Sequence, residues 1–401
     1  MSKKSARTIW YIFAVATAFL NATAFTVTGI YYVNEVGLNP LELILIGTAM
    51  ESAGFLFEIP TGVIADVYSR RASVIIGVFL SGVAIILIGA YPNFHSIAAA
   101  GFLYGFAYTF ISGAIDAWLA DEIGPENLGP AYFRAAQLGY AGSLLGIGVG
   151  VGMATLDFSL PIVVAGVATI AHAGLLLMWM PEAGFQRADR EGGNTWRAMA
   201  STLVDGVEQV RGRPVLIVLL AIAGLMGMYS EGIDRLSEAH LLINFEFPEI
   251  GGLQPVVWLG SLRAIALVLG FVGTTIAKRK VDPSKPRQAS AALFAISAIE
   301  IVGTIGFALA REFPLAVACV WFAGMARSSA GPIYRTWLNQ NLDSRSRATV
   351  MSMSGQMNAL GQIGGGPAVG AIGSAFSLRA ALVTSGLILS PALWLYARVR
   401  R

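Results

Sequence analysis

Long apolar runs recur along the whole chain and constrain the fold more strongly than any other feature. A helix that crosses the hydrocarbon core of a bilayer needs about 20 mostly apolar residues. Runs of this length predict an all-α membrane protein with twelve transmembrane helices. They lie at residues 10–33, 41–65, 72–90, 96–120, 131–155, 159–180, 214–244, 253–277, 288–310, 314–339, 348–375 and 378–397.

Composition excludes a set of soluble domains. Hydrophobic residues make up 55% of the 401 residues and charged residues 13%, whereas soluble proteins carry about 25% charged residues. The formal net charge of +3 comes from basic residues in short loops between the runs, so we expect no nucleic-acid partner. The single cysteine, Cys319, excludes an intrachain disulfide and a cysteine metal cluster.

Basic residues outside the spans predict the orientation of the chain. The first apolar run exceeds the roughly 7–15 residues of a signal-peptide core, so we expect it to be the first span. An even number of spans puts both termini on one side. Of the 27 Lys and Arg residues, Arg311 and Arg379 alone fall in loops on the opposite side. The positive-inside rule therefore predicts cytoplasmic termini in a multi-pass protein of the cell (inner) membrane.

A weak internal repeat relates the two halves of the chain. It links spans four and five to spans ten and eleven, as a six-plus-six duplication requires. We therefore predict two pseudo-symmetric six-helix bundles, 1–180 and 214–401, joined by a cytoplasmic central loop, 181–213. Within that loop, residues 195–209 form either an amphipathic surface helix or a plain linker. One constant shift in numbering matches Trp118-Leu119 with Trp337-Leu338, Gln137 with Gln356, Gly142 with Gly361, Gly146 with Gly365, and Asp116 with Arg335.

The loop after the second span carries the most specific motif. It reads Gly62-Val-Ile-Ala-Asp66-Val-Tyr-Ser-Arg70-Arg71 and resembles the G-x-x-x-D-[RK]-x-G-[RK]-[RK] signature of the major facilitator superfamily. Val67 replaces the first basic residue of the signature, and Ser69 replaces its second glycine, which we expect to loosen the loop. The resemblance covers the whole chain and implies the major facilitator fold and transport by alternating access.

Two further segments resemble one subgroup of that superfamily, the drug:proton antiporters of the tetracycline-resistance-like type. They are Phe57–Gly62, which reads F-E-I-P-T-G, and the segment Tyr229–Leu236 of span seven. This resemblance implies proton-coupled efflux. The glycine-rich motif of antiporters is only partly present. Span five lacks its Gly-Pro kink, which occurs instead in span eleven, and the glycines of span five predict close or sliding helix contacts.

The signature loop predicts a conformational latch of Gly62, Asp66, Arg70 and Arg71. Gly62 is expected to let two helices approach closely. Asp66 is expected to cap a neighbouring helix N-terminus or to pair with a basic residue such as Arg347. The alternative is a short charged turn with a topological role.

Ionisable residues inside apolar spans are costly and usually face a cavity. Buried carboxyl groups that exchange a proton are what proton coupling needs. The proton-coupling candidates are Asp116, Glu231, Asp234, Glu51, Glu58 and Glu300. The substrate-cavity candidates are Arg235, Arg263, Arg327, Arg335, Tyr108, Trp118 and Trp337.

Several of these assignments have a structural alternative. Glu231, Asp234, Arg235 and Glu238 share one helix face, which is either a substrate or proton site or a mutually neutralised cluster. Asp116 and Arg335 form a gate pair, or each pairs within its own half. Arg263 and Arg327 meet an anionic substrate or balance Glu300, and Glu58 serves either coupling or the latch.

Enzyme signatures are missing from the chain. It contains no P-loop, no H-E-x-x-H and no G-x-S-x-G motif, so we expect no enzyme activity, no cofactor and no metal. We expect a monomer whose partners are a small-molecule substrate, protons and the lipid bilayer. The leading prediction is proton-coupled efflux of amphipathic small molecules or drugs. The alternatives are proton-coupled uptake of a small metabolite and, more remotely, a non-transporting receptor or regulatory membrane protein.

Overall fold

The computed structural model describes residues 5–185, 210–249, 251–340 and 347–399. It divides into two units: residues 1–189 with 247–264, and residues 190–246 with 265–401. The predicted bundles, 1–180 and 214–401, and the cytoplasmic termini stay predictions. The helix or linker predicted for residues 195–209 lies outside the described residues.

The regular secondary structure of the described residues is helical, and the predicted all-helical architecture is confirmed. The first unit contains α1 (Ala6–Phe25), α2 (Thr28–Ile30), a π-helical turn (Tyr31–Glu35), α3 (Pro40–Val67), α4 (Arg70–Ala90), α5 (Phe94–Ile123), a 3₁₀ turn (Pro125–Asn127), α6 (Leu128–Ala154) and α7 (Ser159–Trp179). The remaining helices are α9 (Pro214–Asn244), α10 (Pro255–Lys280), α11 (Pro286–Leu309), α12 (Phe313–Gln340), α13 (Arg347–Ala375), α14 (Leu378–Ile388) and α15 (Ser390–Val399).

Eleven of the described helical segments are long and apolar enough to cross a membrane. Each coincides with a predicted span. The remaining predicted span, 348–375, corresponds to α13, which is 29 residues long. Its many glycines and its amides Gln356, Asn358 and Gln362 lower its hydropathy, because unsubstituted backbone and amide groups prefer water to hydrocarbon.

Prolines and capping residues account for where several helices begin. Pro40, Pro214 and Pro286 occupy the first helical positions of α3, α9 and α11, where a missing N–H costs nothing. Asn39 also forms a capping box with Glu42: its side chain accepts from the Glu42 N–H at 3.1 Å, and its own N–H donates to Glu42 at 2.9 Å.

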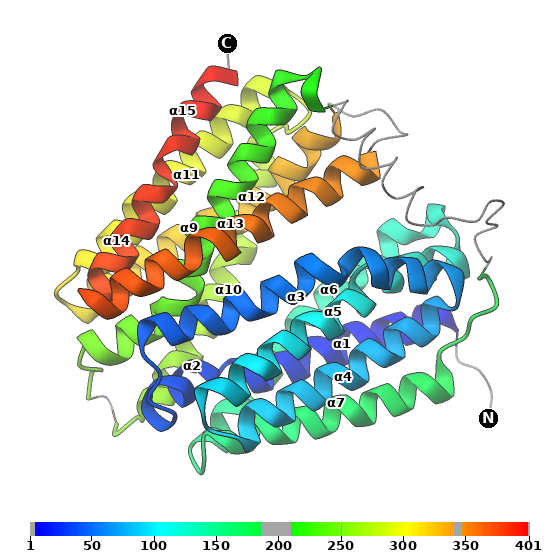
Figure 1. Cartoon of the computed structure of the whole chain (residues 1–401), viewed down its shortest axis with the longest axis horizontal. Helices are drawn as coiled ribbons and strands as arrows, with labels where there is room; N and C mark the ends of the chain where they lie inside the picture. Colours follow the sequence, from blue (N-terminus) through cyan, green and yellow to red (C-terminus); the bar gives the residue numbers. More distant parts are fainter. Residues whose placement is uncertain (1–4, 186–209, 250, 341–346, 400–401) are drawn as a thin grey trace. The chain divides into compact units, whose positions relative to one another are not determined.

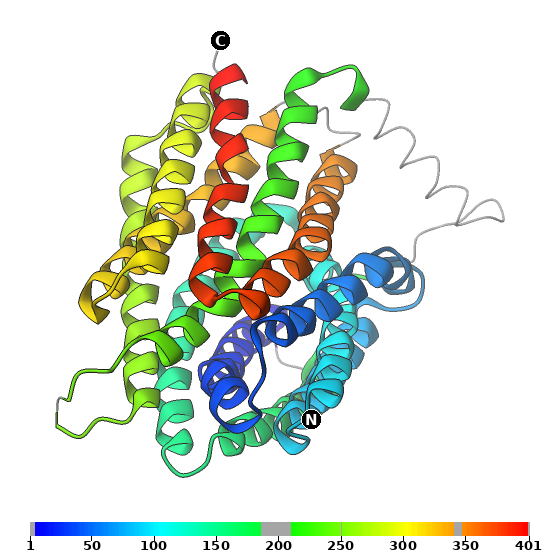
Figure 2. The same cartoon turned by 60° about the vertical axis from the view of Figure 1, so that its left-hand side comes forward.

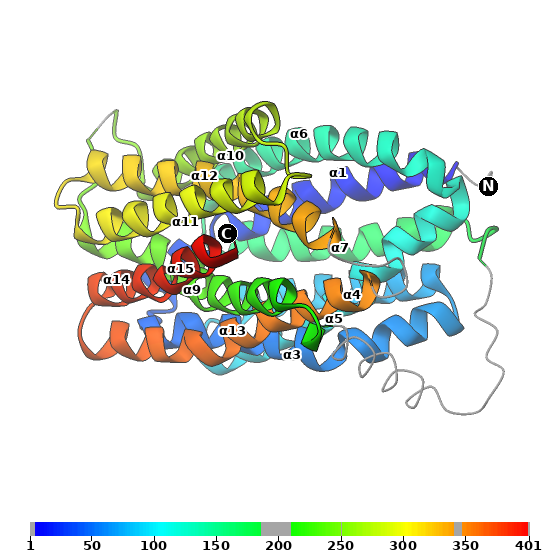
Figure 3. The ribbon, with the colours of Figure 1, turned by 90° about the horizontal axis from the view of Figure 1, so that it is seen from above.

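In the first unit, α1 packs against α6 and α7, α4 packs between α5 and α7, and α3 packs on α5. Figure 1 shows these helices running alongside one another, and Figure 3 shows α1 beside α6 and α7. Their shared core contains Trp10, Phe13 and Trp118 together with aliphatic residues of α4, α6 and α7. In the second unit, α9 packs on α13 and α14, and α11 packs on α12, α14 and α15. Figure 2 shows α15 (red) between α9 (green) and α11 (yellow).

A glycine stripe brings α6 into contact with the backbone of α1. A Cβ added at Gly142 would lie 2.9 Å from the Val15 carbonyl oxygen, and one at Gly150 would lie 2.5 Å from that of Thr23. Gly146, between them, faces the Phe19 carbonyl oxygen. The prediction that small residues allow a close crossing is therefore confirmed for this stripe. Gly361 of α13 faces the Gly224 carbonyl of α9 in the same way, so the sequence repeat has a structural counterpart.

The other face of α6 provides a matched control for this contact. We expect Gly146→Ala to lower stability by about 1–3 kcal/mol, because the added methyl group overlaps the α1 backbone. A Cβ at Gly148 meets no described heavy atom within 4 Å, so Gly148→Ala should be neutral or slightly stabilising through its better helix propensity. Thermal unfolding of both variants in detergent measures the difference. Equal midpoints for the two would contradict the assigned contact.

Candidate functional site

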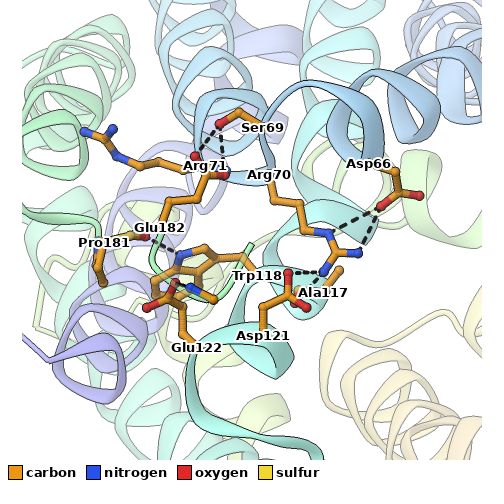
Figure 4. A network of polar contacts seen from close by, with 11 residues as sticks. Asp66, Ser69, Arg70, Arg71, Ala117, Trp118, Asp121, Glu122, Pro181 and Glu182 are labelled. Carbon is orange, nitrogen blue, oxygen red and sulfur yellow. Dashed lines mark hydrogen bonds and ion pairs between the residues drawn. The ribbon is translucent and has the colours of Figure 1, made fainter. Parts of the chain in front are cut away.

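Arg70 of the signature loop joins three helices of the first unit (Figure 4). Its guanidinium donates to Asp66, at 3.3 Å from Nε and 3.2 Å from Nη2. It also donates to the Ala117 carbonyl oxygen at 3.1 Å and forms an ion pair with Asp121 on α5. Because a guanidinium has a rigid fork of donors, one side chain holds the end of α3, the start of α4 and the end of α5 in register.

Ser69 and Arg71 bind the segment that follows α7. Ser69 caps α4, because its Oγ accepts from the Ala72 N–H at 2.9 Å. The same hydroxyl donates to Glu182 at 2.8 Å, and Glu182 accepts from the Arg71 N–H at 2.9 Å. Arg71 Nη2 donates to the Leu177 carbonyl oxygen at 2.6 Å. These contacts hold the loop between α3 and α4 against the C-terminal end of α7 and the residues that follow it.

Two contacts from α5 complete this attachment. Trp118 Nε1 donates to the Pro181 carbonyl oxygen at 2.6 Å, and the Gly184 N–H donates to Glu122 at 2.7 Å. The Arg70 guanidinium also lies 5.9 Å from the centre of the Phe185 ring. These contacts, together with those of Ser69 and Arg71, form one polar network at this end of the unit (Figure 4).

This network corrects two expectations. Gly62 does not mediate a close approach, since a Cβ there meets no heavy atom of the described chain within 4 Å. Ser69 does not loosen the loop: its φ of −175° is extended backbone that needs no glycine, and its hydroxyl adds contacts that glycine lacks. Asp66 pairs with Arg70, while its predicted pairing with Arg347 concerns a side chain outside the described residues and stays a prediction.

Ser69→Gly therefore provides an unusual test, because it restores the signature yet should destabilise the protein. Glycine at an N-cap costs only a few tenths of a kcal/mol, but a lost hydrogen bond to a carboxylate costs about 1.5–3 kcal/mol. Ser377 caps α14 through the Ala380 N–H, and Ser377→Gly removes that cap alone. We expect the thermal midpoint in detergent to fall more for Ser69→Gly. If the midpoint falls no further for Ser69→Gly than for Ser377→Gly, the hydrogen bond to Glu182 does not stabilise the loop.

The second unit contains a cluster of charged residues within its spans, and it begins on α9. Glu231 is 1% exposed, and one oxygen accepts from Arg235 Nε at 3.3 Å. Asp234 is half exposed and accepts both ends of the Arg327 guanidinium, at 2.5 and 2.8 Å. The predicted charged face of span seven is therefore present, and Arg327 of α12 joins it through a bidentate pair.

Arg327 also lies close to Glu300 on α11. The Nε atom is 3.9 Å from a Glu300 oxygen, beyond hydrogen-bond distance, and the Glu300 side chain is 0% exposed. Neither carboxyl oxygen of Glu300 has a hydrogen-bond partner among the described residues. Tyr229 lies beside this group: its ring is 5.8 Å from the Arg327 guanidinium, and its hydroxyl is 2.9 Å from Thr304. One arginine is thus shared unequally between two acids.

Comparison of the sequence with models of known protein families identifies the family of this chain. The family model described as Major Facilitator Superfamily matches residues 11–302. The chain belongs to this superfamily.

The chain is also similar to one curated protein in sequence and to several solved structures in fold. "Uncharacterized MFS-type transporter YxaM" of Bacillus subtilis (strain 168) is 23% identical over 98% of this chain and 95% of its own length. The crystal structure of the nucleoside transporter NupG (D323A mutant) superimposes with a TM-score of 0.82 at 12% identity, covering 98% of this chain and all of NupG. A bacterial homologue of the human lysosomal transporter Spinster, inward-facing and unoccupied, gives 0.78 at 15% identity, covering 100% and 98%. The chain is a multi-pass membrane transporter of this superfamily.

The remaining predicted site residues lie apart from these clusters. Asp116 accepts from the Tyr132 hydroxyl at 3.1 Å within the first unit, and Arg335 is exposed on α12 of the second unit, so their predicted gate pairing stays a prediction. Arg263, on the part of α10 that belongs to the first unit, donates to the Phe25 carbonyl oxygen at 2.8 Å. Glu51 and Glu58 lie on α3, and their coupling role stays a prediction.

The aromatic candidates differ in exposure. Trp118 and Trp337 are each 1% exposed; Trp118 belongs to the core of the first unit, and Trp337 stacks on Tyr396 with ring centres 6.4 Å apart. The structure therefore gives them packing positions and lends no support to a substrate contact. Tyr108 is 58% exposed, and its predicted place in a substrate cavity stays a prediction.

Sequence reasoning missed Asp121, Glu122 and Glu182, which hold the network around Arg70. Each lies just beyond the apolar part of a span. Acidic residues are common at such polar boundaries, so their presence there does not indicate a functional role. The signal that indicates them is Arg70 and Arg71 at the same end of the unit, because basic residues there favour acidic partners on neighbouring helix ends.

Proposed function

We propose that this transporter couples substrate movement to protons, works by alternating access and exports amphipathic small molecules. The observation that carries the coupling is the position of Glu300. An ionised carboxylate without hydrogen bonds, in a site that excludes water, costs several kcal/mol unless a cation compensates it. The nearby cation, Arg327, makes its short bidentate hydrogen bonds to Asp234 and not to Glu300. Uptake of a proton by one of these acids would relieve the shortage of positive charge.

The cluster also suggests how proton uptake affects structure. While both acids are ionised, Arg327 must serve α9 through Asp234 and α11 through Glu300. Protonation of either acid releases the guanidinium toward the other acid or toward an anionic group of a substrate. This is a local change in pairing among three helices of one unit, and it supports a role in switching between states.

The direction of transport and the class of substrate are inferred from resemblance and not from the charged cluster. The segments Phe57–Gly62 and Tyr229–Leu236 resemble drug:proton antiporters, whereas similar solved structures include nucleoside, peptide and organic-anion transporters. The test therefore screens compounds of different charge in proteoliposomes: tetracycline, ethidium as a lipophilic cation and fluorescein as an anion. Accumulation driven by an imposed pH gradient, with the compound moving opposite to the protons, supports proton-coupled efflux. Movement in the same direction as the protons supports uptake instead.

Glu300→Gln is the decisive variant for coupling. It should abolish accumulation driven by the pH gradient while downhill exchange continues, because glutamine keeps the shape of the side chain but carries no proton. Glu312→Gln changes an exposed acid just beyond the end of α11 and should leave accumulation unchanged. Infrared spectra of the lipid-embedded protein give a reading that needs no substrate. A protonated-carboxyl band that disappears on raising the pH should be missing in Glu300→Gln and present in Glu312→Gln.

An unchanged band in Glu300→Gln would exclude Glu300 as the titrating group. If gradient-driven accumulation also stayed normal in that variant, coupling would have to reside elsewhere, and Asp116, Glu231 and Asp234 would be the next acids to replace.

A further inference from the structure

The first unit encloses a cavity that neither the charged cluster nor the signature loop uses. It has a volume of about 70 Å³ and is lined by ten residues of α1, α4, α5 and α7. A single water needs roughly 10–15 Å³ of such space, so the cavity exceeds one water several-fold. It is well below the roughly 300–1,000 Å³ of pockets that bury whole drug-sized ligands. Its size fits one ring or a small molecule.

The lining combines apolar walls with hydrogen-bonding groups. Val78 and Leu20 contribute aliphatic surface, while Ser81, Asn21 and His172 contribute polar atoms. None of the ten lining residues that the structure describes there is an acid, a lysine or an arginine. A charged ligand would lose its hydration without gaining an opposite charge. The cavity therefore favours an uncharged ligand with a mostly apolar body.

His172 provides the anchoring group. Its side chain is 4% exposed, and its Nε2 has no hydrogen-bond partner within the described chain. A buried polar atom left in this way destabilises the folded protein, and a bound hydroxyl would remove that cost. The Phe13 ring packs against the imidazole, with ring centres 6.0 Å apart. By contrast His240, in the second unit, has the Phe307 carbonyl oxygen at 3.3 Å from its Nε2.

Tyr108 is the one exposed residue among the ten that line the cavity, so we infer that the cavity opens beside it. This residue is 58% exposed, while Ser81, Thr169 and His172 are all buried. Tyr104, one turn earlier on α5, lines the cavity together with Asn21 and makes an edge-to-face contact with Phe25, with ring centres 5.3 Å apart. An aromatic residue at the entrance and another along the wall suit a planar ligand, because offset and edge-on ring contacts add to the burial of apolar area.

We propose that this cavity binds an uncharged, single aromatic ring bearing a hydroxyl group, with the hydroxyl bonded to His172. A hydroxyl both donates and accepts, so it satisfies Nε2 in either tautomer of the neutral imidazole. The ring occupies the space between Val78 and Tyr104. The site lies in the first unit and goes beyond the proposed coupling, since binding here requires no proton gradient and no residue of the charged cluster.

The test uses two fluorinated probes, 4-fluorophenol and fluorobenzene, with protein in lipid nanodiscs. Their ¹⁹F resonances report binding, and empty nanodiscs correct for partitioning into lipid. Wild-type protein should broaden the 4-fluorophenol line saturably and bind it about tenfold more tightly than fluorobenzene, the difference that one good hydrogen bond supplies. His172→Phe should reduce this preference to near one, because phenylalanine keeps the ring and loses the nitrogen.

Matched variants keep the outcome interpretable. His95→Phe changes an exposed histidine at the start of α5 and should retain the preference, while Ser81→Leu should fill the cavity and lose both probes. Thermal unfolding shows whether each variant is folded, and His172→Gln, which keeps a hydrogen-bonding group, should retain part of the preference if His172→Phe does not fold. Absence of saturable binding in the wild type would show that the cavity holds only water. A tenfold preference that persists in His172→Phe would likewise overturn the proposal. Either result leaves the Glu300 experiment unaffected.

Discussion

The absence of water from the core of a bilayer is the constraint on which this structure depends. Backbone polar groups at that depth must find partners within the protein, so each described span is helical. Side-chain hydroxyls follow the same rule: Thr23, Thr61 and Thr169 each donate to the carbonyl oxygen four residues earlier. Charged groups obey it through the pairs of Arg235 with Glu231 and Arg327 with Asp234.

Close helix packing is the second consequence of that constraint. Lipid tails are as apolar as leucine side chains, so helices gain little by hiding apolar surface from them, and contact at short distance becomes the main source of attraction. This explains why glycines concentrate on the face of α6 that meets α1. The polar network of Arg70, Glu182 and Trp118 holds the ends of the same unit, so packing operates along the helices and hydrogen bonding at their boundary.

The sequence predicted the fold well because span length and apolar runs are local properties. Each of the twelve predicted spans corresponds to a described helix, and α13 was found from its length although its glycines and amides lower its hydropathy. The candidate site was predicted only in part. The face of Glu231, Asp234 and Arg235 follows from helical periodicity, whereas the choice of Arg327 for Asp234 over Glu300 depends on three helices far apart in the chain. The acids around Arg70 were missed for the same reason. The expectation for Gly62 was wrong because a family signature does not report what packs around a residue, and that for Ser69 because it does not report local backbone angles.

Glu300 and His172 depart from the rule of internal pairing in an informative way. Both are nearly or fully buried, and both carry unpartnered atoms on groups that take up or share protons. Selection for stability alone would remove such groups, since an apolar residue of similar shape costs less at the same position. Their presence is best explained if the missing partner arrives during function. In our proposal the partner of Glu300 is a proton, because Arg327 is already engaged by Asp234. The proposed partner of His172 is a neutral hydroxyl, because the described wall around it carries no charged residue.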